Sequence, residues 1–389
     1  NIDGVTASYK VNGEDYATQF LRSGSAATHP TAPTAGAGQT FDGWFKADGT
    51  RWDFTTAVTE NATLMGWLYV PVTNETELRA ALADDTVDVI RLTGDIDISA
   101  SLTILRKVTL DLNGHVLKMT GSGSVIILDN NGTTTGDLTL MDSDPTAEHK
   151  FKVNGVEPWV LDDSGTEIVK GGVITGGTGT KVFNSNYTEG GGVIIGGGTL
   201  TMNGGNIVGC IAYCGGGVFV YEGGTFTMNG GSMVGCSSTY RRSATGEPVD
   251  SGISSRSNDL NKLAVITLNG GLIKNIGQYS INDMYGTTIY ANGGEVYGEF
   301  YVGQTSKVTS LPGHTGVTVF RGRTVIDGAS GANVSHIDWG IYYGEMYFAD
   351  DGKDITTGLT VTYMINGVEY AKQILPSGTL ATRPDDPTI

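Results

Sequence analysis

Short stretches in which apolar and polar residues alternate recur along the chain, each four or five residues long and each followed by glycine. Residues 199–202 (TLTM) and 225–228 (TFTM) show the pattern most clearly. Alternation with a period of two indicates β-strands that bury one face. We predict that the apolar residues of these and the next such stretch point inward in stacked rows: Leu200, Met202, Phe226, Met228, Ile266 and Leu268. Thr201 and Thr227 are predicted to point outward.

These stretches belong to an internal repeat. Residues 190–210 (GGGVIIGGGTLTMNGGNIVGC) and 215–236 (GGGVFVYEGGTFTMNGGSMVGC) match with one inserted residue, and Cys210 and Cys236 lie 26 residues apart. One unit cannot bury its apolar row alone, but parallel units stacked about 4.8 Å apart bury a continuous core. A period of about 23–26 residues fits one turn of a right-handed parallel β-helix. The Leu-x-x-Leu-x-Leu frame of a leucine-rich horseshoe is missing.

The open ends of a β-helix expose unpaired strand edges, which need covers. Residues 74–77 (NETE) form a capping box, so we predict an amphipathic helix over 75–84 that lays Leu78, Ala81 and Leu82 on the first coil. The aromatic-rich residues 339–349 are predicted to cover the last coil.

A second kind of repeat joins the two ends of the chain. Residues 4–34 and 358–388 are identical at 16 of 31 positions, and each copy carries an Asn-Gly pair between alternating stretches. Asn-Gly in this setting is a strong signal for a β-hairpin. The second copy lacks a counterpart to residues 41–52. Half a small β module cannot bury its apolar face, so we predict that its strands pair with the β-helix flank or with a neighbouring chain.

Composition narrows the class of protein. The 389 residues include 59 glycines without a three-residue period and only 10 prolines, which excludes collagen. The net charge of −17 disfavours binding to nucleic acid. No apolar run is long enough to insert in a membrane. Because the chain begins at Asn1 without Met or a signal peptide, we expect it to be a fragment of a longer protein.

The N-terminal residues resemble the Listeria–Bacteroides repeat, a small β-grasp-like module of Gram-positive surface proteins and internalins. The Asn-Gly turn, a G…P…P run, FDGW (41–44), WDF (52–54) and VTENATL (58–64) follow in family order over residues 4–68. The trailing motif of the family is replaced here by MGW (65–67). From the residues alone, we expect the aromatic side chains to form a small core that includes Trp44 and Trp52.

The central coils resemble the pectate-lyase-like β-helix superfamily, in particular the glycine-rich coils of gut-bacterial surface proteins, over residues 85–345. That superfamily contains lyases, hydrolases and adhesins, so the fold alone does not give the function. We expect an all-β chain: a repeat module (1–70), a linker and capping helix (71–84), a right-handed parallel β-helix (85–350), and a linker with the first half of a second module (351–389). The resemblance implies that the protein is extracellular, either at the bacterial cell surface or secreted.

Three features of the sequence contain residue types that can bind metals or phosphate or react, but we interpret them as structural. Cys210, Cys214 and Cys236 form a buried thiol ladder or a disulfide (Cys210–Cys214 or Cys210–Cys236), while nearby histidines for zinc are missing. The tract 171–181 (GGVITGGTGTK) lacks the Gly-Lys-Ser/Thr of a phosphate loop and is read as coil turns. His115 follows an Asn-Gly turn and is read as a turn residue.

Catalysis on a β-helix needs carboxylates from neighbouring coils that converge with each other or with a base. The regular coils offer only Glu222 and Glu189, and Asp250, Asp259 and Asp283 share no register. We therefore predict no catalytic residue, no metal and no cofactor. Two or three carboxylates clustered with Arg or Lys in one groove would instead favour an enzyme.

Residues 237–263 interrupt the coil period, since Asn229 and Asn269 lie 40 residues apart. Inserts on a solenoid often carry the binding surface, although a solvated loop would look the same. Tyr240, Arg241 and Arg242 are the candidate ligand-binding residues within it, and Tyr213 and Tyr221 are candidates beside it. We expect an adhesin-like protein that binds a glycan or a host surface protein. The alternatives are a polysaccharide lyase or glycoside hydrolase, and a structural spacer.

Overall fold

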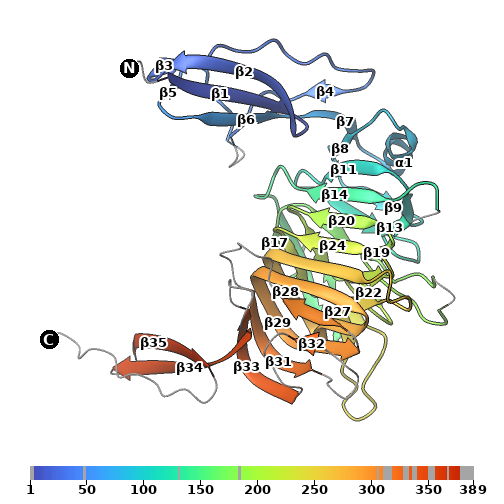
Figure 1. Ribbon diagram of the computed structural model, residues 1–389. Coiled ribbons are helices and arrows are strands. Elements are labelled where there is room, and N and C mark those ends of the chain that lie inside the picture. The colour runs from blue at the N-terminus through green and yellow to red at the C-terminus, as the bar shows by residue number, and fades with distance from the viewer. Residues whose placement is uncertain are drawn as a thin grey trace.

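The computed structural model describes residues 4–46, 50–129, 132–182, 185–304, 306–309, 318–326, 333–334, 340–348, 355–365 and 368–376. Side chains are described up to residue 303 and at Ser306, Val308 and Thr318. In these residues nearly all the regular structure is β-strand, with one helix, α1, near the start of the long solenoid (Figure 1).

The N-terminal module is a small β structure, as predicted. Its main sheet has the order β2-β1-β6, formed by Glu14–Arg22, Gly4–Val11 and Ala62–Gly66, and β3 (Ser25–Ala26) pairs with β5 (Ala57–Val58). The predicted hairpin turn is present: Asn12 and Gly13 both have positive φ, 52° and 90°, as a type I′ turn requires. Tyr9 and Trp44 are fully buried with their ring centroids 4.9 Å apart, and Trp52 packs against this core while remaining partly exposed.

The central part is a parallel β-helix, which confirms the expected fold class. Its strands stack in three faces (Figure 1). Face one comprises β7 (Leu68–Val72), β8 (Val89–Leu92), β11 (Lys107–Asp111), β14 (Asp137–Met141), β20 (Thr199–Met202), β24 (Thr225–Met228), β30 (Lys307–Thr309) and β32 (Asn333–Val334). Face two comprises β9 (Ile96–Ile98), β12 (Val116–Met119), β18 (Val173–Thr175), β21 (Asn206–Val208) and β25 (Ser232–Val234).

Face three comprises β10 (Leu102–Ile104), β13 (Ile126–Asp129), β19 (Val193–Gly196), β23 (Val218–Tyr221) and β27 (Asp250–Arg256). The long strands β28 (Ala264–Tyr285) and β29 (Thr287–Gln304) bend through all three faces, and β31 (Val319–Ile326) continues faces two and three. Two short strands, β22 (Ile211–Ala212) and β26 (Ser237–Ser238), pair at the corner between faces two and three. This corner carries the candidate site.

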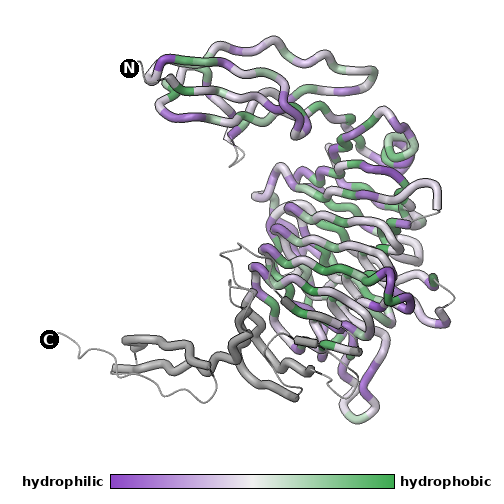
Figure 2. Tube along the Cα trace, in the orientation of Figure 1, coloured by the Kyte–Doolittle hydropathy of each residue, from purple (hydrophilic) through white to green (hydrophobic). Residues whose placement is uncertain are grey.

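The predicted core register is confirmed. Leu200 pairs with Phe226 and Phe226 with Ile266, while Met202, Met228 and Leu268 form the next row. All six side chains are at most 1% exposed, whereas Thr201 and Thr227 are partly exposed on the opposite side. Figure 2 shows hydrophobic and hydrophilic residues alternating along these coils.

The capping helix also forms where expected. α1 (Glu75–Ala83) begins at Asn74, whose side chain accepts a hydrogen bond from Glu77 N at 3.0 Å, and Leu78 and Ala81 are buried. The guanidinium of Arg106 donates to the carbonyl oxygens of Ala81 and Leu82 at 2.9 Å each. Both ends of the helix are therefore capped, one by its own sequence and one by a residue of the first coils.

A buried arginine joins the N-terminal module to the β-helix. β4 (Thr40–Phe41) pairs with β7, which in turn pairs with β8 of the first coil. The Arg91 guanidinium lies 2.6 Å from a carboxylate oxygen of Asp42 in the module and 2.6 Å from one of Asp111 in the β-helix, and it stacks on the Tyr69 ring. Because Arg91 is 7% exposed, this three-residue contact ties the two parts by charges that water does not screen.

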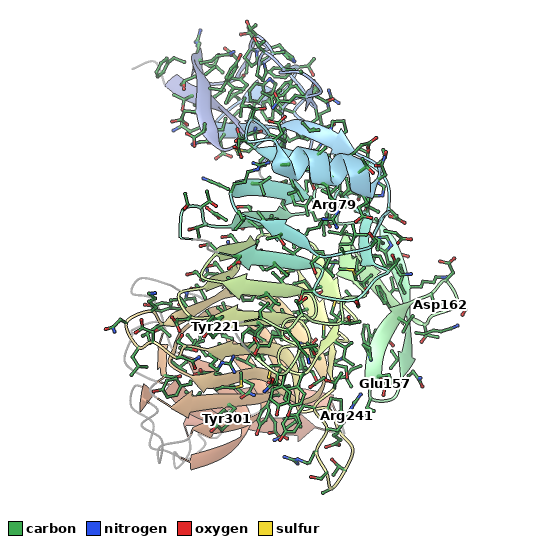
Figure 3. The ribbon with its side chains drawn as sticks, turned by 90° about the vertical axis from the view of Figure 1, so that its right-hand side faces the viewer. Arg79, Glu157, Asp162, Tyr221, Arg241 and Tyr301 are labelled. Atoms are coloured by element: carbon green, nitrogen blue, oxygen red, sulfur yellow. The ribbon has the colours of Figure 1, made fainter. Side chains whose placement is uncertain are left out.

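A three-stranded sheet is inserted after β14, which the sequence analysis did not predict. It has the order β16-β15-β17 (Glu157–Leu161, Glu148–Asn154, Glu167–Lys170) and covers face two with the buried Phe151. Trp159 N donates to the carbonyl oxygen of Gly235 at 2.9 Å, and a Cβ on Gly235 would lie 2.2 Å from the Trp159 ring. Glycine at this place in the repeat therefore makes room for the inserted sheet. Figure 3 shows Glu157 and Asp162 on this insert.

At the far end, β33 (Gly340–Phe348) pairs antiparallel along β31, which agrees at the level of the backbone with a cover over the last coil. The second repeat copy forms a hairpin of β34 (Ile355–Ile365) and β35 (Val368–Pro376), and the start of β34 pairs with β33. The hairpin thus has a backbone partner in the solenoid. Its apolar contacts, on which the prediction of a borrowed partner rests, lie outside the described side chains.

The cysteines are free thiols, and the disulfide alternative is not realised. Cys210 and Cys236 are completely buried one coil apart in the same row. Burial raises the pKa of the Cys236 thiol far above its usual range, and a hydrogen bond with Cys210 adds to the shift. The tract 171–181 forms β18 and a coil turn in which Gly171, Gly176 and Gly179 adopt positive φ, and His115 lies just after the turn at Asn113 and Gly114.

Candidate functional site

Tyrosines occupy the corner between faces two and three on four successive coils. Tyr187, Tyr213 and Tyr240 form a continuous stack: the ring centroids are 4.0 Å and 4.9 Å apart, with interplanar angles of 16° and 22°. These steps match the rise between coils. Tyr187 and Tyr240 are 52% and 44% exposed, so the stack lies on the surface. Tyr279 follows at the same corner of the next coil, where Asp250 pairs with it.

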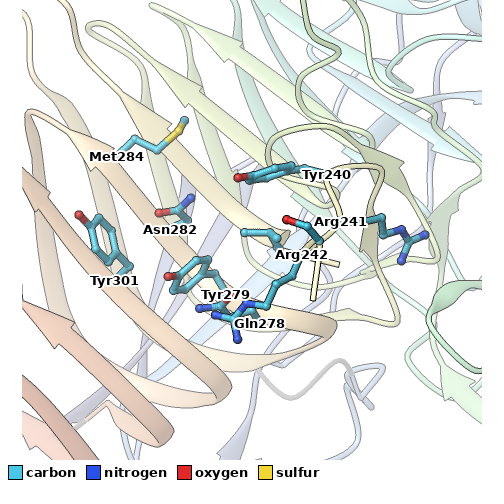
Figure 4. Close-up of a pocket in the computed structure, with 10 residues that line it drawn as sticks. Tyr240, Arg241, Arg242, Gln278, Tyr279, Asn282, Met284 and Tyr301 are labelled. Carbon is cyan, nitrogen blue, oxygen red and sulfur yellow. The ribbon is translucent and has the colours of Figure 1, made fainter. Parts of the chain in front are cut away.

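The stack ends at a cavity of about 560 Å³ (Figure 4). Tyr240 lies on one side of it, and Tyr279 and Tyr301 lie on the other, with their ring centroids 5.8 Å apart. The polar side chains of Gln278 and Asn282 complete the lining together with Arg241, Arg242, Ser243, Val249 and Met284. The cavity therefore offers aromatic faces, amide groups and arginine in one place, which is the usual composition of a small-ligand site.

The two neighbouring arginines have different roles. The guanidinium of Arg241 turns away from the cavity (Figure 4) and donates to the carbonyl oxygen of Val156 and to Glu157 Oε1, both at 3.2 Å. This contact holds the 240–249 loop against the inserted sheet. Arg242 is exposed and extends beside Gln278 and Tyr279 (Figure 4), and it forms no ion pair among the described residues.

Of the five residues that the sequence analysis proposed, four lie together: Tyr240, Arg241 and Arg242 line the cavity, and Tyr213 stacks behind Tyr240. Tyr221 lies at the opposite end of its strand, next to a second cavity of about 670 Å³. That cavity also contains Asp129, Glu222 and Lys262. Because Asp129 pairs with Gly196 and Gly196 with Tyr221, the two acidic residues are separated by about two coils.

Three acidic residues that the sequence analysis weighed as catalytic candidates are buried in the structure. Glu189, Asp250 and Asp283 are 0%, 2% and 0% exposed. Glu189 pairs with Arg256 at 3.1 Å, and Asp250 accepts a hydrogen bond from Ser254. Burial raises the pKa of Asp250 to about 6 and that of Asp283 to about 7. The carboxyl group of Asp250 lies against Asn282, which lines the cavity. That of Asp283 lies against the hydroxyl groups of Ser255, Thr287 and Ser306.

Only part of the segment 237–263 leaves the β-helix, which corrects the interpretation that the whole segment interrupts the coils. Residues 250–256 form β27, a regular strand of face three that pairs with β23 and β28. Its serines, Ser251, Ser254 and Ser255, are fully buried. The residues that leave the β-helix lie on either side of β27, and the first group of them includes Tyr240, Arg241 and Arg242.

Comparison with known proteins agrees with this architecture. Residues 69–235 match the model of the pectate lyase-like adhesive domain, and residues 6–66 match that of the Listeria-Bacteroides repeat domain. The chain carries both domains. Searches of curated proteins and of solved structures find no match.

The two domains are typical of extracellular or surface proteins, and the larger one is an adhesive domain, which supports an adhesin-like function at a surface. Within the part of the chain that the structure describes, no helix is long and apolar enough to cross a membrane. The same residues contain no group of three or more His, Cys, Asp or Glu arranged to hold a metal ion. The match to the adhesive domain ends at residue 235, so the cavity is formed by coils beyond it.

Tyr187 and Tyr301 were not among the predicted site residues. A signal for Tyr187 was present, because Tyr187, Tyr213 and Tyr240 recur at intervals of 26 and 27 residues, close to the repeat period. Tyr301 has no such signal, since it lies in the face-three segment of β29, where it pairs with Asn282 of β28, which also lines the cavity.

Proposed function

We propose that this chain is a glycan-binding adhesive segment, displayed outside a Gram-positive bacterium, whose binding site is the cavity between Tyr240, Tyr279 and Tyr301. The proposal rests mainly on the end of the tyrosine stack. One face of Tyr240 is covered by Tyr213, and the other borders the cavity. A sugar ring placed there would continue the stack as its next member.

The chemistry of the lining suits a sugar. Tyrosine offers a flat apolar face together with a hydroxyl group, which matches the apolar and polar sides of a pyranose. Tyrosine also loses little conformational entropy on binding, and here neighbouring rings already hold Tyr240. Gln278 and Asn282 supply hydrogen-bond donors and acceptors for hydroxyl groups. A shallow site of this kind gives weak binding that many copies on a surface strengthen.

The test is binding of the purified chain to a glycan array, followed by calorimetry on the best ligand. Tyr240→Ala is expected to weaken binding at least about tenfold, because it removes the stacking face. Tyr240→Phe, which keeps the ring, is expected to retain most of the affinity. Phe20→Ala is the matched control, since Phe20 is an 85% exposed aromatic residue in the N-terminal module. Equal binding by all four proteins would refute this site.

A second function has one observation in its favour. Asp129, Glu222 and Lys262 line the other cavity, and a separation of two coils, about 10 Å, is near the distance between the acid and base of inverting glycosidases. If this cavity is an active site, the chain cleaves polysaccharides, and Glu222→Gln abolishes the cleavage while Tyr240→Ala does not. Reducing-end assays and ultraviolet absorbance of unsaturated products detect hydrolysis and elimination. Binding without any product supports the adhesive function.

A further inference from the structure

The charge of the cavity lining differs from that of the rest of the chain. The protein carries a net charge of −17, yet the residues that line the tyrosine cavity include two arginines and no carboxylate. Three further cavities each include at least two acidic residues: Asp129 and Glu222; Glu75, Asp95 and Asp97; Glu247 and Glu299. The side chains that line the tyrosine cavity thus carry positive charge only, while the nearby carboxyl group of Asp250 is buried behind the lining residue Asn282.

The two arginines do not contribute equally to this charge. Glu157 pairs with Arg241 and offsets it. Arg242 also borders the neighbouring cavity that contains Glu247 and Glu299, but neither carboxylate reaches it within 4.0 Å. Glu299 instead accepts a hydrogen bond from Gln278 at 2.9 Å. The guanidinium of Arg242 thus has donors available for a ligand.

The position of Arg242 relative to the aromatic faces indicates what it can bind. A ring on the free face of Tyr240 would lie between that tyrosine and Tyr279, and Arg242 extends along the Tyr279 side of the same cavity (Figure 4). A planar guanidinium binds carboxylate and sulfate-like groups through two parallel hydrogen bonds. From these observations we infer that the ligand is an anionic sugar, whose ring stacks on Tyr240 and whose acidic group binds Arg242. This inference rests on the proposed function of the site.

The experiment compares sugars that differ only in charge. Oligosaccharides of uronic acids are paired with their methyl esters, and sulfated oligosaccharides with their desulfated forms, so that the two sources of negative charge are separated. Binding of the full chain is measured by calorimetry at low and at physiological salt. One acidic form is expected to bind at least about tenfold more tightly than its neutral partner. This preference is expected to shrink as salt increases.

Arg242→Gln keeps a polar side chain without the charge. It is expected to remove the preference for the acidic sugar, so that the acidic and neutral partners bind with similar affinity. Arg22→Gln, at an exposed arginine of the N-terminal module, is the control and is expected to keep the preference. Equal binding of acidic and neutral forms overturns this inference but leaves glycan binding intact. A preference that survives in Arg242→Gln overturns it as well, and failure of every glycan to bind overturns the proposed function itself.

Discussion

Asp283 provides a sharp test of the internal structure, because its carboxyl group is buried without a cationic partner among the described residues. Its side chain is 0% exposed, one of its oxygens has no hydrogen-bond partner, and the groups around it are the hydroxyls of Ser255, Thr287 and Ser306. Burial raises its pKa from the ordinary value of 3.8 to about 7. The fold therefore holds the proton more tightly than the unfolded chain does, by about 4 kcal/mol.

The sign of the pH dependence follows from this difference. The contribution of Asp283 to stability is complete below pH 4 and is lost as the pH rises toward 7, because the fold must then either bury a charge or keep a proton. Asp283→Asn cannot ionise. Relative to the unmodified chain, we expect this variant to gain up to about 4 kcal/mol between pH 4 and pH 8, which corresponds to several degrees in melting temperature.

The assay is thermal unfolding, followed by circular dichroism from pH 4 to pH 8, and the quantity of interest is the difference between variant and unmodified chain. Asp259→Asn is the matched control. The pKa of the partly exposed Asp259 is lowered, chiefly by a hydrogen bond from the backbone of Asn261. Its contribution to stability is therefore present above about pH 4 and is lost only below that pH, so the difference for Asp259→Asn is expected to stay nearly constant from about pH 5 to about pH 8. A difference for Asp283→Asn that does not change with pH, or that grows toward acid, would refute the reasoning.

Three further changes test the packing. Phe226→Ala is expected to lower the free energy of unfolding by about 3–5 kcal/mol in urea titrations, and Thr227→Ala by less than about 1 kcal/mol; a reversed order would exclude the register. Gly235→Ala places a Cβ 2.2 Å from the indole of the inserted sheet, so the amides of that sheet are expected to exchange faster, and unchanged protection would contradict the contact. Arg91→Met leaves the buried carboxylate of Asp111 and the partly buried one of Asp42 without this cation and is expected to cost about 3–5 kcal/mol by calorimetry. Arg79→Met, in a partly exposed pair, is expected to cost less than about 1 kcal/mol, and equal costs would contradict a buried junction.

The fold could be predicted because its determinants are local and periodic. Alternation in TLTM and TFTM gives the buried face, the 26-residue interval gives the coil, and Asn74 with Glu77 gives the capping helix. Each signal lies within one coil or between identical places in neighbouring coils. A solenoid repeats its contacts, so a residue's place in the repeat gives its environment.

The features that could not be predicted break this periodicity. The β15–β17 sheet replaces a short corner between two faces, and its sequence does not resemble a coil. The buried serines of β27 and the carboxyl groups of Asp250 and Asp283 look like loop residues by composition, because polar side chains are usually exposed. They are inside because β27 continues face three in register, with hydrogen bonds among the polar side chains.

Part of the candidate site had a sequence signal, and the rest did not. Tyr240 and Arg242 were found because they lie in a break of the repeat, and Tyr213 because it lies beside that break. Tyr221 carries the same exposed aromatic chemistry, but it leaves face three at a different corner. Which corner a side chain occupies depends on how many residues each turn uses, and insertions change that number from coil to coil.

The most direct test of the central claim is a crystal structure of the chain with the best ligand from the glycan array. We predict a sugar ring stacked on Tyr240 between that residue and Tyr279, with its acidic group within hydrogen-bond distance of the Arg242 guanidinium. A ligand bound instead in the cavity of Asp129, Glu222 and Lys262, with Tyr240 untouched, would contradict it.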